Sequence, residues 1–124
     1  MVEAKTVGDI VKYETPFDYG RKVITIKQVA GATAGLPIGQ LLEDAATKAV
    51  AVATGADCDA VLLEEVALAD LKAGDTSRVA LVKGPAVIDA DQVTVAGAQK
   101  VAALAALSAL GIVSRVGPTY TVGV

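Results

Sequence analysis

The sequence contains neither histidine nor tryptophan, and its only cysteine is Cys58. Histidine is the most common general base and transition-metal ligand, so its absence also removes Ser–His and Cys–His nucleophile pairs. A single cysteine cannot form an intramolecular disulfide, and without histidine it cannot complete a structural zinc site. We therefore expect no catalytic residues, no metal site and no cofactor.

Positive charge is scarce and scattered. The chain has 11 basic and 14 acidic residues, giving a formal net charge of −3, and its only adjacent basic residues are Arg21 and Lys22. Because affinity for nucleic acid rests mainly on Lys and Arg neutralising phosphates, we expect no nucleic-acid partner.

Long hydrophobic runs are also missing. The longest weakly polar stretch, residues 101–113, is too short to span a bilayer, and the first residues lack the apolar core of a signal peptide. We therefore expect no membrane partner.

The acidic residues leave one catalytic alternative open. Asp57 and Asp59 flank Cys58 beside a Gly-containing turn, where solvated carboxylates are common. A hydrolase-like domain using Asp57 or Asp59, or a small-molecule-binding β-barrel, is therefore the alternative to a structural function. We expect Cys58 to pack as a small apolar residue at a strand edge.

The first 20 residues differ in composition from the rest of the chain. They mix charged and isolated apolar residues, and they contain two of the three tyrosines and the only phenylalanine. We predict two parts: an extended N-terminal arm (1–20), with a disordered terminus as the alternative, and a β-rich domain (21–124). The arm's apolar and aromatic residues are candidates for binding another protein: Ile10, Val11, Tyr13, Pro16, Phe17 and Tyr19.

Short aliphatic segments separated by Gly, Pro and Asp predict a mainly β (α+β) fold. Strands spaced in this way are typical of a small barrel or sandwich, and we predict a small barrel-like or tulip-like domain. The predicted strands are 23–26, 41–42, 49–53, 61–66, 79–82, 86–88, 112–116 and 119–122.

Residues 99–110 break this pattern and predict one helix near the C-terminus. Leucine or valine recurs every third residue, with alanine, the best helix former, at most positions between. Gly111 is placed to end the helix in the left-handed conformation, and Thr94 is a candidate N-cap.

The predicted helix is almost uncharged. From Gln92 to Val124 the only charged residues are Lys100 and Arg115. A helix that is small or apolar on nearly every side should be buried all round. We expect one face to meet the sheet and the other a neighbouring subunit, through these core and trimer-contact residues: Val101, Leu104, Ala105, Leu107 and Ser108.

Two stretches together resemble the head decoration proteins of lambda-like tailed bacteriophages. The first combines residues 60–66 (AVLLEEV), the Gly74-Asp75 turn and residues 79–88 (VALVKGPAVI). The second is residues 102–115 (AALAALSALGIVSR), which is similar to the late Ala/Leu helix, Gly-Ile pair and closing Arg of that family. The resemblance covers about residues 22–116, whereas the tail from Gly117 to Val124 and the arm match no family motif.

The resemblance implies a structural phage protein rather than an enzyme. Family members form homotrimers on the outer surface of the mature capsid, at three-fold positions, where they bind the major capsid protein and cement the capsomers against DNA pressure. It also implies synthesis in the host cytoplasm, and an N-terminal arm that can add a strand to the capsid protein. A capsid, tail or fibre subunit is the remaining structural alternative.

Overall fold

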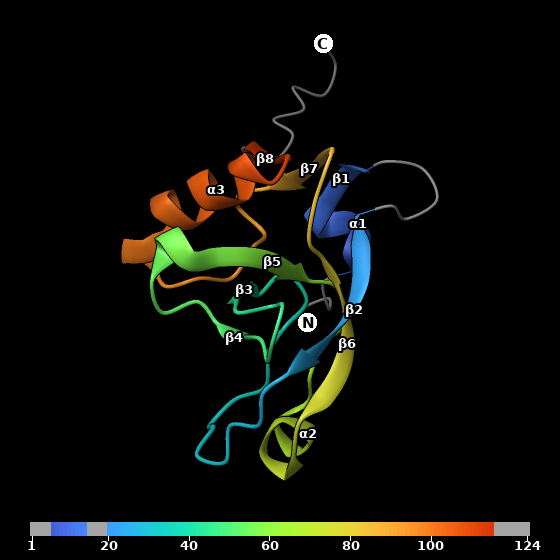
Figure 1. Cartoon of the computed structure of the whole chain (residues 1–124), viewed down its shortest axis with the longest axis vertical. Coiled ribbons are helices and arrows are strands. Elements are labelled where there is room, and N and C mark those ends of the chain that lie inside the picture. The colour runs from blue at the N-terminus through green and yellow to red at the C-terminus, as the bar shows by residue number, and fades with distance from the viewer. Residues whose placement is uncertain (1–5, 15–19, 116–124) are drawn as a thin grey trace, which may run out of the picture.

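The computed structural model describes residues 6–14 and 20–115, and within them eight strands form two sheets (Figure 1). The larger sheet has the order β2 (Arg21–Ile26), β6 (Thr76–Leu81), β5 (Cys58–Leu62), β3 (Leu41–Glu43) and β4 (Val50–Ala51). The smaller has the order β1 (Val11–Glu14), β7 (Ala86–Asp89) and β8 (Ile112–Arg115). The helical elements are α1 (Val7–Ile10), η2 (Gly55–Asp57), α2 (Leu68–Ala73), η3 (Gly97–Gln99) and α3 (Lys100–Ala109). The predicted mainly β fold with a helix near the C-terminus is confirmed.

The five-stranded sheet curls until its two edge strands approach each other. They meet at one isolated parallel bridge, Ile26 to Ala49, where the Lys27 N–H donates to Ala49 O at 2.9 Å and the Ala49 N–H to Thr25 O at 2.8 Å. Beyond this bridge β2 and β4 are not paired. The larger sheet among the described residues is therefore curled but does not close into a barrel.

The smaller sheet brings the C-terminal helix onto the domain. β7 and β8 pair in parallel, and the chain between them passes through α3. Neighbouring parallel strands need a crossover of this kind, because a tight turn can join only antiparallel ones. α3 consequently lies beside β8 and packs against β5 and η2 (Figure 1).

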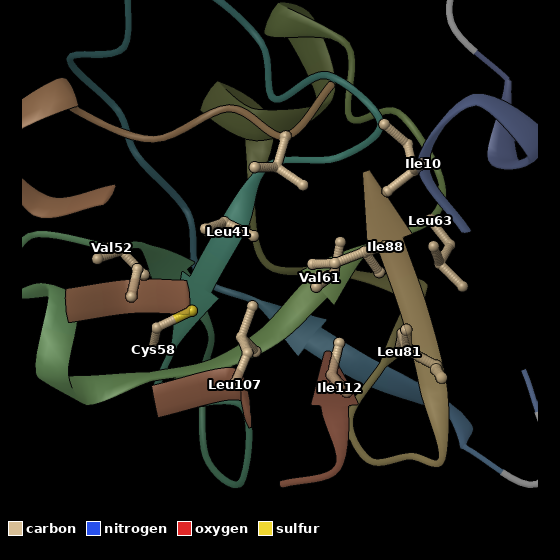
Figure 2. Close-up of a cluster of buried hydrophobic side chains, with 13 residues drawn as sticks. Ile10, Leu41, Val52, Cys58, Val61, Leu63, Leu81, Ile88, Leu107 and Ile112 are labelled. Carbon is tan, nitrogen blue, oxygen red and sulfur yellow. The ribbon is translucent and has the colours of Figure 1, made fainter. Parts of the chain in front are cut away.

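Two apolar clusters meet at β5, which is buried on both faces. Val61 packs into one cluster, shown in Figure 2, together with side chains from β7, β8 and α3. Its neighbour Leu62 packs into the other, inside the curled sheet. Because successive side chains of a strand point to opposite faces, a continuous aliphatic run is what a strand between two cores requires.

Glycine determines how α3 ends. Gly111 has a φ of +85°, which favours glycine at the end of a helix, and the predicted C-terminal glycine is thereby confirmed. The Gly84 N–H donates to Leu110 O at 2.9 Å, and a Cβ on Gly84 would lie 1.9 Å from Gly111 O. The backbones therefore approach too closely here for a side chain at Gly84.

Several predicted boundaries need correction. The N-cap of α3 is Gln99, the last residue of η3, rather than Thr94. β5 begins at Cys58, three residues before the predicted strand, and ends at Leu62. The helices α1 and α2 and the strand β1 were not predicted. The last predicted strand, 119–122, lies outside the described residues.

The N-terminal segment is folded onto the domain where the structure describes it. α1 leads into β1, which pairs antiparallel with β7, and Ile10 is fully buried in the first core cluster. An isolated aliphatic residue in a polar segment can be buried if its neighbours form a short strand at a sheet edge. No helix within 6–14 or 20–115 is long and apolar enough to cross a membrane.

Candidate interaction surface

Helix α3 packs on the domain through one face. Ala103 and Leu107, one helical turn apart, have no solvent exposure, and Leu104 and Ala106 are partly buried beside them. Figure 2 shows Leu107 pointing toward the core that it shares with Val61 and other strand residues. The periodic leucines of the sequence are thus core residues only where they lie on this face of the helix.

The start of α3 is held against η2 by a close backbone approach. Gly55 is buried, and a Cβ there would lie 2.4 Å from Gln99 O and 2.9 Å from Ala102 Cβ. Its N–H donates to Gln99 Oε1 at 2.9 Å. Gly55 and the amide of Gln99 therefore fix where the helix begins.

The opposite side of α3 is exposed and uncharged. Val101 is 82% exposed, and the other solvent-facing side chains of the helix are small. We call this set the outer face of α3, and it comprises Val101, Ala102, Ala105, Ser108 and Ala109. No charged residue lies between Lys100 and Arg115.

Within the single chain α3 is buried on one face only, and burial of its other face against a neighbouring subunit stays a prediction. A helix lying on the surface of a domain can turn only one face to the core, and here that face carries Ala103 and Leu107. The outer face of α3 has no covering element among the described residues. Solvent exposure of such an uncharged aliphatic surface is unfavourable unless another protein covers it.

The five helix residues predicted from the sequence divide between the two faces. Leu107 is buried and Leu104 is half-buried, so both are core residues. Val101, Ala105 and Ser108 are exposed together on the outer face of α3. The structure therefore places Leu104 and Leu107 in the core, and a subunit contact through Val101, Ala105 and Ser108 stays a prediction.

Two exposed aliphatic residues that the sequence prediction omits come directly after the helix. Leu110 is 39% exposed and Val113 is 50% exposed. In β8, the buried Ile112 and the exposed Val113 follow the alternation of a strand. Leu110 is the last residue of the three-residue Leu/Val spacing, and Val113 continues the uncharged stretch beyond Gly111; neither was among the predicted contact residues.

The predicted arm residues have mixed positions. Ile10 is in the core, so in this conformation its side chain is unavailable to a partner. Val11 is half-buried and pairs with Ile88, and the backbone of Tyr13 pairs with Val87. Three others, Pro16, Phe17 and Tyr19, lie outside the described residues. A capsid-binding arm remains a prediction.

The candidate chemical residues have structural roles. Cys58 is 3% exposed, as predicted for a small apolar residue, and burial raises the pKa of its thiol to about 11. Burial likewise raises the pKa of Asp59, whose two carboxylate oxygens each accept from the Ala45 N–H at 3.2 Å. Asp57 lies exposed in η2. Within 6–14 and 20–115, no three His, Cys, Asp or Glu side chains gather as a metal site would require.

Comparison with known proteins gives one match. The family model described as bacteriophage lambda head decoration protein D matches residues 1–112. No curated protein and no solved structure matches the chain significantly. The family match includes the N-terminal segment, both sheets and α3, and it ends at Ile112 within β8. The chain therefore belongs to the bacteriophage lambda head decoration protein D family, a family of structural proteins of the phage capsid.

Proposed function

We propose that this protein binds the outer surface of the mature phage capsid as a homotrimer at three-fold positions, contacts the major capsid protein and cements neighbouring capsomers. Its family supports a role in capsid decoration. The proposal of a trimer rests on the exposed, uncharged outer face of α3, where Val101 is 82% exposed.

The chemistry of that face suits contact between copies. Burying Val101, Ala105 and Ala109 against a neighbour removes aliphatic surface from water without desolvating a charge. Small side chains also allow close backbone approach. The face of one copy would meet a different patch on the next, because a cyclic trimer is built from heterologous contacts.

The capsid contact is proposed for the N-terminal residues that do not belong to the core. Phe17 and Tyr19 offer aromatic side chains of the kind that dominate interface energetics. Ile10 is excluded from this role because it is buried within its own chain. The proposed contact residues are therefore Pro16, Phe17 and Tyr19, which follow β1 in the sequence, and not Ile10.

A binding experiment with expanded capsids of the phage that encodes the protein tests the proposal. Wild-type protein should bind in multiples of three copies and raise the temperature at which the shells rupture. Ala105→Glu should reduce binding strongly, because a charge would enter an apolar contact. Ala69→Glu, at an exposed site in α2, is the matched control and should bind like the wild type.

Two results would contradict the proposal. If wild-type protein bound shells as single copies, the proposed trimer would be excluded. If Ala105→Glu protein bound and stabilised shells to the same extent as Ala69→Glu protein, the outer face of α3 would not be part of the contact.

A further inference from the structure

A second apolar feature lies toward the other end of the molecule from α3. A pocket of about 230 Å³ opens between the loop after β2, the edge strand β4 and α2. Its walls are mainly aliphatic and include Ile26, Val29, Leu36 and Leu71. Figure 1 shows α2 and the loop after β2 at the opposite end of the long axis from α3 and β8. The pocket is therefore separate from the outer face of α3.

The pocket reaches into the curled sheet. β2 and β4 touch only at the bridge between Ile26 and Ala49, and both residues line the pocket and belong to the second core cluster. Ala51, two residues after Ala49, lines it as well. An apolar cavity of about 150 Å³ can hold a molecule of the size of benzene. The pocket therefore has room for a short alkyl chain.

The walls of the pocket are held in place by hydrogen bonds within the chain. Val29 N–H donates to Leu71 O at 2.9 Å, and Gln28 Nε2 donates to Lys72 O at 2.7 Å, so the loop after β2 is tied to α2. Gln28 N–H donates to Asp75 Oδ1 at 2.8 Å. The pocket is therefore preformed, which lowers the entropic cost of filling it.

One cationic residue lines the apolar pocket. Lys27 is exposed, and it forms no ion pair with any residue of 6–14 or 20–115. Asp75, which follows α2, is bonded instead to Lys48 Nζ at 2.6 Å and to the Gln28 N–H. The ammonium group of Lys27 is therefore available to an anionic group of a bound molecule.

A second hollow adjoins the apolar pocket. It measures about 400 Å³ and shares Lys27 and Val50 with the pocket. Its other lining residues, Asp44, Thr47 and Lys48, are polar. Small-molecule sites combine apolar walls with a few polar groups that fix the orientation of the ligand. The two hollows together provide this combination, with Lys27 common to both.

We propose that the two hollows form a binding site for a small amphiphile with a short alkyl chain and a carboxylate head. The chain would fill the apolar pocket, and the head would meet the ammonium group of Lys27. A carboxylate is favoured over an ammonium head because Lys27 lines both hollows, whereas Asp44 lines only the second. The site lies away from α3, so the proposal does not depend on the trimer.

Titration of the full-length protein with alkyl carboxylates tests the site. Octanoate should bind saturably at one site per chain, and its alkyl protons should show nuclear Overhauser effects to the methyl groups of Val29, Leu36 and Leu71. Hexanoate should bind about tenfold more weakly, because it buries two fewer methylene groups. Octylamine, which has the same chain length and the opposite charge, should bind more weakly than octanoate.

Two substitutions test the chain and head contacts separately. Ala51→Phe should fill the pocket and weaken octanoate binding at least about tenfold, because the alkyl chain would lose its burial. Ala53→Phe, at an exposed position outside the pocket, is the matched control and should bind octanoate like the wild type. Lys27→Gln should weaken octanoate binding about threefold, as expected for one exposed ion pair, and leave octanol binding unchanged. Spectra of the free variants establish that each is folded.

Several results would overturn the proposal. They are a lack of saturable octanoate binding, binding that Ala51→Phe leaves unchanged, and binding of hexanoate or octylamine as tight as that of octanoate. Unchanged octanoate affinity in Lys27→Gln protein would exclude the head contact. Binding to phosphatidylglycerol vesicles but not to monomeric octanoate would assign the surface to a membrane instead. None of these results would alter the proposed capsid function, which does not use this pocket.

Discussion

The N-terminal segment α1–β1 and the helix α3 divide their aliphatic residues differently between core and surface. Ile10, in a segment with several charged residues, is fully buried, whereas Val101, in a helix whose only charged residue is Lys100, is 82% exposed. α1–β1 carries few aliphatic residues, and the core takes Ile10. α3 carries apolar or small residues on every side, more than its core-facing side can bury. The exposed apolar and small side chains of α3 are available for contact with a second protein chain.

The largest expected effect comes from charging the buried face of α3. Ala103→Glu should cost several kcal/mol of unfolding free energy, because Ala103 has no exposure and a buried carboxylate would lack a partner. Chemical denaturation of the full chain measures it. A variant as stable as the wild type would show that this face is not packed in the core.

Ile10→Ala tests whether the N-terminal segment α1–β1 is packed in the core. Truncating a buried isoleucine leaves a cavity and should cost roughly 2–5 kcal/mol. The denaturation midpoint should fall accordingly, whereas Thr54→Ala, at an exposed position whose side chain makes no capping hydrogen bond, should change it little. If Ile10→Ala were neutral, the N-terminal segment would be a detachable arm throughout.

Gly111→Ala should have a smaller effect. A non-glycine residue at a φ of +85° costs about 1–2 kcal/mol, and the added Cβ would lie 3.3 Å from Gly84 Cα. The loss should be seen in the thermal unfolding of the free chain. Unchanged stability would mean that the end of α3 is not confined to the left-handed conformation.

Cys58 provides a pH-dependent test of the core. Burial raises its thiol pKa to about 11 from 9.0, so the unfolded chain loses this proton at lower pH than the folded chain. The contribution of the neutral, buried thiol to the free energy of unfolding is fully present below pH 9 and is lost as pH rises through about 11. Between pH 8 and 10.5, the urea midpoint of the wild type should fall more than that of Cys58→Ala. Equal declines would show that the thiol is not held in its neutral form by burial.

Ala105→Glu should have the smallest effect on the free chain, within about ±0.5 kcal/mol, because its side chain points to solvent. Together with Ala103→Glu it forms a matched pair on one helix. Denaturation should separate the two variants, and shell binding should be lost in Ala105→Glu protein despite normal folding. A large destabilisation by Ala105→Glu would place this residue in the core instead.

Much of the fold follows from local sequence patterns. The β-branched run 23–26, the Ala/Leu helix and Gly111 as its end were all predicted, because each depends on neighbouring residues. β1 was missed because its strand character comes from pairing with β7, more than 70 residues away in the chain. α2 was missed because it is six residues long and its N-cap, Ala67, makes no side-chain capping bond.

The candidate surface was predicted only in part. The lack of charge between Lys100 and Arg115 led to the prediction that α3 is a contact element, but the Leu/Val spacing does not show which side faces the core. That depends on the close approach of Gly55 and on the parallel crossover from β7 to β8. The pocket near Ala51 was not predicted, because it is created by two strands that part after one bridge.

The most direct test of the account is a reconstruction of the decorated capsid in which α3 can be resolved. The account predicts three copies around each local three-fold axis, with Val101 and Ala105 of every copy packed against the adjacent copy. The same map should place the proposed arm on the major capsid protein. A reconstruction in which the outer face of α3 points into solvent on every copy would contradict the central claim.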